Sequence, residues 1–296
     1  MTDGPRLLLG ILVIVTVIYI WRWIALERRN PNAVNYRPRP ADLLLGFGTN
    51  FFDALGIGNF APTTAVFKLT RRMPDENIPG TLNVGHTVPV LLEGLIFIAA
   101  VAVDFTTLAG MIAAAVLGAW LGAGIVGRLS RRRVQLGMGI ALLLAASLFL
   151  AANLHWMPTG GEALGLSGGR LTIAICANFL LGALMTLGVG LYAPCLILVS
   201  LLGMSPLAAF PIMMGSCALL MPVAGLRFIR ALRYEPAAAI GLAIGGVPGV
   251  LIAALIVKSL PIVWLRGLVV VVVVYAALMM LLSARRDRLT ANEALS

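Results

Sequence analysis

The sequence has little charge. Charged residues make up 11% of the 296 residues, whereas 60% are apolar and the mean hydropathy is +0.99. Soluble domains have about 25% charged and about 45–50% apolar residues. This composition excludes a soluble fold and predicts a polytopic membrane protein.

Residues that build metal sites and catalytic centres are scarce as well. The chain has two histidines, His86 and His155, and three cysteines that all fall in apolar segments. No CxxC pair, no Cys/His spacing and no nucleotide-binding loop occurs, so neither a disulfide framework nor a zinc site is indicated. No nucleophile–base pair appears either. We therefore expect no enzymatic activity and no cofactor.

Positive charge is concentrated between the apolar runs. The net charge is +10, and 17 of the 22 Lys and Arg residues fall within 28–39, 68–72, 128–133, 227–233 and 285–288. Short cytoplasmic loops carry the Lys/Arg excess of membrane proteins, so all five clusters should be cytoplasmic. The clusters are typical of topology signals, and we expect no nucleic-acid partner.

Simple crossings cannot satisfy this charge pattern. Apolar segments lie at 5–26, 41–69, 78–103, 105–127, 134–156, 170–202, 206–226, 236–258 and 262–284. If each crossed once, clusters 68–72 and 128–133 would be external. The conflict disappears if 41–69 and 170–202 are re-entrant hairpins. Both exceed the roughly 20 residues that one crossing needs.

The two long segments share a break at mid-length. The break has the same pattern in both segments: Gly56, Gly58, Ala61 and Pro62 recur 132 residues later as Gly188, Gly190, Ala193 and Pro194. The same offset relates Phe47 to Phe179, Pro74 to Pro206 and Pro79 to Pro211. Paired glycines permit non-helical dihedrals, and a following proline suits the start of a helix. The repeat therefore predicts two copies of one unit. Two kinked single spans are the alternative.

The predicted fold class is an all-α polytopic membrane protein with an N-terminal anchor helix and two inverted repeats. Each repeat is a re-entrant broken hairpin followed by three transmembrane helices. The expected parts are an anchor and basic linker (1–40), repeat 1 (41–156), an external linker (157–169), repeat 2 (170–284) and a cytoplasmic tail (285–296). The N-terminus is then outside and the C-terminus cytoplasmic.

Inverted repeats with broken helices are typical of secondary transporters. A helix that begins inside the membrane has unpaired N–H groups and roughly +0.5 elementary charge at its start, which favours an anion. We therefore expect a small oxyanion to bind where the two hairpin turns meet. The candidate substrate-binding residues are Gly56, Gly58, Asn59, Pro62, Thr63, Gly188, Gly190, Tyr192, Pro194, Cys195 and Ser216.

Ionisable residues within apolar segments are costly and usually functional. Glu93 follows His86 by two helical turns, on a face shared with Asn83, and Asp53 directly precedes the first turn. Asp53, Asn83, His86 and Glu93 are the candidate ion-coupling residues. Plainer roles stay open: a hydrogen bond from His86 to a carbonyl, capping of the turn by Asp53, and pairing of Glu93 with an arginine.

Three features of the sequence resemble the TauE/SafE sulfite-exporter family, also called the toluene-sulfonate uptake permease family. They are the glycine-turn hairpins, the run from Gly182 to Pro222, and Gly245–Gly249 followed by Leu260-Pro261 and Leu265-Arg266. The resemblance covers about 41–284 and is stronger in the second repeat. It implies a bacterial inner-membrane carrier of sulfite, organosulfonates or related sulfur-containing anions, coupled to an ion gradient. The family usually has a run of glycines at each turn, whereas Asn59 and Leu191 follow the glycines here.

The sequence thus predicts a secondary transporter that works by alternating access, with a small sulfur-containing oxyanion, a coupling proton or sodium ion and the lipid bilayer as its partners. An anion channel is the alternative, and an intramembrane enzyme or assembly factor is a more distant one. The exact anion, the direction of transport, the choice of ion and the oligomeric state stay open, and a homo-oligomer is compatible with these features.

Overall fold

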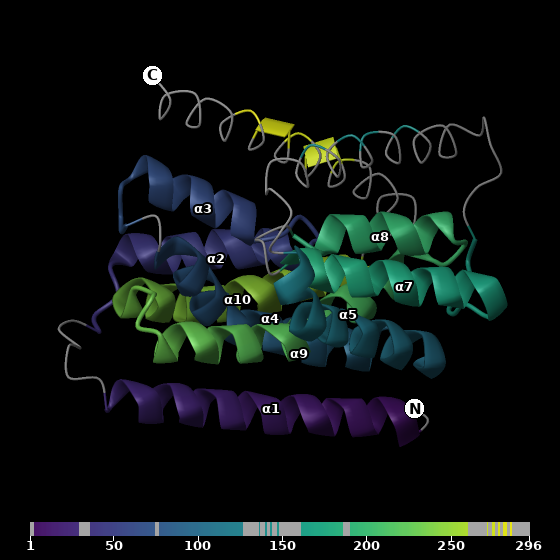
Figure 1. Cartoon of the computed structure of the whole chain (residues 1–296), viewed down its shortest axis with the longest axis horizontal. Helices are drawn as coiled ribbons and strands as arrows, with labels where there is room; N and C mark the ends of the chain where they lie inside the picture. Colours follow the sequence, from purple (N-terminus) through teal and green to yellow (C-terminus); the bar gives the residue numbers. More distant parts are fainter. Residues whose placement is uncertain are drawn as a thin grey trace. The chain divides into compact units, whose positions relative to one another are not determined.

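The computed structural model describes residues 3–29, 36–74, 77–126, 161–185 and 190–259, with a few isolated positions between 136 and 285. All named elements in these ranges are helices (Figure 1): α1 (Asp3–Glu27), α2 (Pro40–Ala54), α3 (Phe60–Leu69), α4 (Ile78–Ala100), α5 (Phe105–Val126), α7 (Gly168–Met185), α8 (Tyr192–Leu201), α9 (Pro206–Arg230) and α10 (Pro236–Ser259). The predicted crossings 134–156 and 262–284 lie largely outside the described residues.

Five of the described helices are long and apolar enough to cross a membrane. They comprise Gly4–Glu27, Ile78–Ala100, Gly168–Met185, Pro206–Arg230 and Pro236–Ile256. Prolines interrupt three of them, at Pro89 in α4, at Pro211 and Pro222 in α9, and at Pro248 in α10. Membrane helices tolerate prolines where neighbouring helices satisfy the freed backbone groups. The all-α polytopic membrane fold is confirmed.

The predicted break in segment 41–69 is present. Helix α2 ends at Ala54 and α3 begins at Phe60. Between them Gly56 and Gly58 have φ values of 92° and 89°. Glycine adopts such values without the clash that a Cβ atom causes, so the glycine pair explains why the helix stops and a new one starts here.

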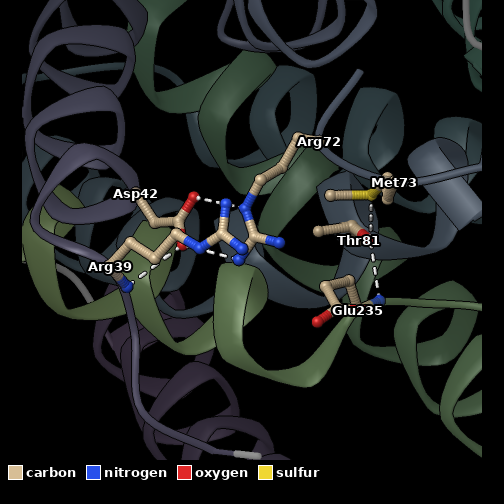
Figure 2. A network of polar contacts seen from close by, with 6 residues as sticks. All are labelled: Arg39, Asp42, Arg72, Met73, Thr81 and Glu235. Atoms are coloured by element: carbon tan, nitrogen blue, oxygen red, sulfur yellow. Dashed lines mark hydrogen bonds and ion pairs between the residues drawn. The ribbon is translucent and has the colours of Figure 1, made fainter. Parts of the chain in front are cut away.

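Helices α2 and α3 fold back on each other. Asp42 lies in the first turn of α2, and Arg72 follows the end of α3. The Arg72 Nη2 atom lies 3.0 Å from Asp42 Oδ2, and Nε lies 3.2 Å from Oδ1 (Figure 2). Helix α2 is about 22 Å long at 1.5 Å per residue, so a kinked rod would hold these two residues far apart. The segment is a hairpin closed at its base by an ion pair.

Further hydrogen bonds fix this base. The backbone N–H of Arg39 donates to Asp42 Oδ2 at 3.2 Å. The hydrogen bond to Asp42 raises the pKa of Arg72. Thr81 at the start of α4 accepts the backbone N–H of Glu235 at 2.9 Å and donates to Asn77 O, with Met73 Sδ at 3.2 Å (Figure 2). The ends of α2, α3, α4 and α10 are thereby tied together.

The second long segment also returns to its starting point. The backbone N–H of Ser205, just after α8, donates to Ala163 O just before α7, at 2.9 Å. Ala163 and Met204 form an isolated parallel β-bridge. Adding 132 to the bounds of α3 gives the bounds of α8, so this helix recurs at the offset found in the sequence. Residues 186–189 of the second turn, Gly188 among them, lie outside the described residues.

The chain forms two compact units that do not follow its order. One comprises Met1–Phe105 and Phe210–Ser259, and the other comprises Thr106–Ala209 and Leu260–Ser296. The first hairpin therefore shares a unit with α10, which belongs to the second predicted repeat. Each hairpin packs against a helix from the other repeat.

Glycines make this packing close. A Cβ atom on Gly46 of α2 would lie 2.6 Å from Leu242 O of α10, and one on Gly249 of α10 would lie 2.4 Å from Phe47 O. Such distances leave no room for a side chain. Helices α2 and α10 are thus in backbone contact along several turns.

The second unit repeats the arrangement. A Cβ atom on Gly118 of α5 would lie 1.9 Å from Phe179 O of α7. Phe179 corresponds to Phe47 at the 132-residue offset, and Gly118 corresponds to Gly249 after a one-residue slip. The same pair of positions therefore makes the helix contact in both copies, and Gly118 serves close packing within the chain.

Within the first unit, helix α1 packs against the other helices with one side. Tyr19 OH donates to Val84 O of α4 at 3.2 Å, and Trp23 Nε1 donates to Tyr234 OH at 3.2 Å. The opposite side exposes large apolar residues such as Leu7, Ile14 and Trp21. This distribution suits a helix that packs on protein on one side and faces lipid on the other.

We expect Gly46→Ala to destabilise the protein and Gly48→Ala not to. The added methyl group at Gly46 meets the α10 backbone, whereas a Cβ atom at Gly48 has no neighbour within 4 Å. Alanine should otherwise favour both helical positions by about 1 kcal/mol. The melting temperature of the detergent-purified variants measures the difference. Equal melting temperatures would contradict the close contact of α2 and α10.

The hairpins also make the topology testable. In a Cys176→Ala background, which removes the exposed native thiol, Thr70→Cys should react with an impermeant maleimide from the cytoplasm and Ser167→Cys from outside. Both positions are exposed and lie at hairpin bases. Thr70→Cys labelled from outside would refute the cytoplasmic opening of the first hairpin.

Candidate functional site

The first hairpin turn gathers a set of buried polar side chains. They come from the end of α2, the start of α3 and the middle of α4, and each is at most 4% exposed. The set, here called the polar cluster, consists of Asn50, Asp53, Asn59, Thr63, His86 and Glu93. Burial of polar groups is costly unless they are hydrogen bonded, so their partners matter.

Asn59 is the centre of the polar cluster. Its side-chain Nδ2 donates to Asn50 Oδ1 at 3.0 Å and to Asp53 Oδ2 at 2.7 Å. Asp53 also accepts the backbone N–H of Asn59 and hydrogen bonds to the Glu93 side chain. Asn59 directly precedes α3, so the Asp53 carboxyl lies at the positive end of that helix.

His86 connects α4 to both helices of the hairpin. Its Nδ1 lies 3.0 Å from Asn50 Oδ1, and its Nε2 lies 3.1 Å from Thr63 Oγ1. Asn50 Nδ2 donates to Gly46 O at 2.8 Å, which identifies Oδ1 as the acceptor. Because an amide oxygen only accepts, His86 carries a hydrogen on Nδ1.

The hydrogen on Thr63 has two acceptors. Thr63 Oγ1 lies 2.7 Å from Asn59 O and 3.1 Å from His86 Nε2. With neutral His86, the hydroxyl donates to Nε2. With protonated His86, Nε2 donates to the hydroxyl, which then donates to Asn59 O. The site therefore accommodates two protonation states without moving a heavy atom.

The second repeat carries none of this polar set. At the 132-residue offset, each residue of the polar cluster has an apolar or small counterpart. In the order Asn50, Asp53, Asn59, Thr63, His86 and Glu93, the counterparts are Gly182, Met185, Leu191, Cys195, Ala218 and Gly225. Helix α8 nevertheless starts and ends at the positions equivalent to those of α3. The polar cluster is therefore not needed to build a hairpin, and function is the better explanation for its cost.

Three of the four predicted ion-coupling residues belong to the polar cluster. Asp53, His86 and Glu93 lie in it, whereas Asn83 is half-buried and donates to Pro79 O of its own helix at 2.9 Å. Sequence reasoning missed Asn50. Its signal was a polar residue one turn before Asp53 whose repeat counterpart is glycine.

The predicted substrate-binding residues are distributed over both units. Gly56, Gly58, Asn59, Pro62 and Thr63 form the first turn and the start of α3. Gly190 is exposed, and Tyr192, Pro194 and Cys195 are buried at the start of α8. Ser216 is buried on α9 and donates to Ile212 O at 2.7 Å. The two turns belong to different compact units, and their meeting at one site stays a prediction.

Comparison with known families decides the identity. The model of the sulfite exporter TauE/SafE family matches residues 2–149. The chain belongs to this family. No curated protein and no solved structure matches the chain.

The TauE/SafE match covers the anchor and the first repeat. The sequence motifs had suggested a stronger resemblance in the second repeat. The matched half contains the polar cluster, the first hairpin and α4. TauE/SafE proteins are membrane transporters of sulfite or related sulfur-containing anions and are not enzymes.

The two hairpin turns should respond differently to the same substitution. Gly58 has φ +89°, and Gly190 has no positive φ, while neither has a neighbour within 4 Å of a Cβ atom. Gly58→Ala should cost roughly 1–2 kcal/mol from backbone strain alone. Gly190→Ala is the matched control and should be tolerated. Thermal unfolding of both variants measures this, and equal stability would show that the Gly58 conformation is not required.

Proposed function

We propose that this TauE/SafE protein carries sulfite, an organosulfonate or a related sulfur-containing anion across the bacterial inner membrane by alternating access, with coupling to an ion gradient. The N-terminus lies outside and the C-terminus in the cytoplasm. The polar cluster at the first hairpin turn performs the coupling, and the helix start beside it contributes to anion binding.

One observation carries the proposal. Six polar side chains are buried at a turn that the second repeat builds from apolar and small residues. Such groups are retained inside a membrane at a cost, and they usually mark an ion or substrate pathway. The family indicates the class of substrate. The polar cluster is the proposed place where proton binding and anion binding influence each other.

The chemistry of the turn fits a proton better than sodium. Sodium needs several oxygen ligands, and at the turn Asn50 Oδ1 and Asp53 Oδ2 already accept hydrogen bonds from Asn59 and His86. The two hydrogen-bond arrangements around His86 differ by one proton. We therefore choose the proton as the coupling ion.

Flux measurements test the transporter function. Purified protein in proteoliposomes loaded with unlabelled sulfite should take up labelled sulfite transiently above equilibrium, because a carrier exchanges substrate. Uptake should saturate with concentration. A flux that neither saturates nor shows counterflow would favour the anion channel instead. Sulfate, thiosulfate, taurine and sulfoacetate as competitors identify the preferred anion.

We expect Thr63→Val to reduce transport at least tenfold. The substitution keeps the shape of the side chain but removes the hydroxyl that joins His86 Nε2 to the backbone carbonyl of Asn59. Thr70→Val is the matched control, because Thr70 lies at the exposed end of the same helix and bonds only within it. Its transport should equal that of the native protein. Normal counterflow by Thr63→Val would place the essential chemistry outside the polar cluster.

A further inference from the structure

The start of α3 is already neutralised by the protein itself. Asp53 accepts both the backbone N–H and the side-chain amide of Asn59, at the end of the helix where an anion was expected to bind. Asn59 Nδ2 has two hydrogens, and both are used, one by Asp53 and one by Asn50. An arriving oxyanion finds these donors occupied by the Asp53 carboxyl group and the Asn50 amide oxygen.

Asp53 and Glu93 hydrogen bond to each other. Two carboxyl groups do so only when at least one carries a proton, and we infer a resting pair that shares one proton and carries one negative charge. That charge faces the helix start and repels a second anion. A second proton removes the charge and weakens the hold of Asp53 on the Asn59 donors.

We propose that Asp53 is an internal anion that competes with the substrate at the start of α3, so that a proton must bind the Asp53–Glu93 pair before the substrate anion can. The inference rests on the proposed function and adds how the proton is coupled to the anion. The two bind together and cross the membrane in the same direction. The protein is then a proton–anion symporter.

The surroundings of Asp53 contain few other groups that titrate. Helix α4 brings His86 and Glu93, and α3 has only Lys68, which is exposed near its far end. Helix α10 has no ionisable side chain between Pro236 and Ile256. His86 is therefore the one competing proton site in the polar cluster.

Binding linkage provides the test. Sulfate and thiosulfate keep a fixed charge across the neutral range, so the pH dependence of their affinity reports on the protein. For the native full-length protein in detergent, the Kd should rise about tenfold per pH unit where the pair loses its second proton. For Asp53→Asn, the Kd should be low and constant with pH. Glu162→Gln, an exposed control in the other unit, should keep the native slope.

Transport measurements should distinguish the native protein from Asp53→Asn in the same way as the binding measurements. An inward proton gradient should drive accumulation of the anion by the native protein and leave Asp53→Asn at equilibrium, while counterflow persists in both. If Asp53→Asn inserts poorly, Asp53→Met is the second variant, because the second hairpin has Met185 at this position. A native slope in Asp53→Asn, or a slope abolished by His86→Gln alone, would overturn the assignment.

The outcomes separate this inference from the proposed function. If the native protein binds and transports none of the sulfur anions, the proposed function fails. If it transports them and Asp53→Asn keeps the native pH dependence, the function stands and the role of Asp53 is refuted.

Discussion

A chain that turns back within a membrane must satisfy its own backbone polar groups, because lipid offers no hydrogen bonds. At the first hairpin turn Asp53, at the end of α2, meets part of this requirement, because it accepts the backbone N–H and the side-chain amide of Asn59, the residue directly before α3. The same contact places a carboxyl group next to His86 and Glu93. The structural need of the turn and the chemistry of the candidate site are therefore met by one set of hydrogen bonds.

The interleaved packing keeps this turn in place. Hairpin helix α2 lies against α10 through backbone contacts at Gly46 and Gly249, and its base is closed by the ion pair of Asp42 and Arg72. A rigid base and a close helix contact leave the turn as the part whose hydrogen bonds can change. In the proposed mechanism, protonation changes these hydrogen bonds and thereby alters the affinity for an anion.

The two repeats share a backbone plan and differ in chemistry. The first copy has the polar cluster, whereas the second has Met185, Leu191 and Cys195 at the equivalent positions. Duplication explains why both hairpins form. In the proposed mechanism, divergence lets the first copy bind the proton, while the second copy has apolar residues at the equivalent positions.

Much of this was readable from the sequence. Mean hydropathy and the five basic clusters determined a polytopic membrane protein with two folded-back segments, and the 132-residue offset gave the helix breaks near Gly56 and Gly58. These features are local or follow from counting charges, so no tertiary information is needed. Asp53, His86 and Glu93 were selected for the same reason, because an ionisable residue in an apolar run is visible by itself.

The tertiary structure alone decided which polar residues meet. Asn50 and His86 are 36 residues apart and touch, whereas Asn83, on the same helix as His86, bonds to Pro79 instead. Likewise the pairing of α2 with α10 joins residues about 200 positions apart. Periodicity gives the faces of a helix, but the choice of partner helix depends on which backbones can approach, and that choice belongs to the folded chain as a whole.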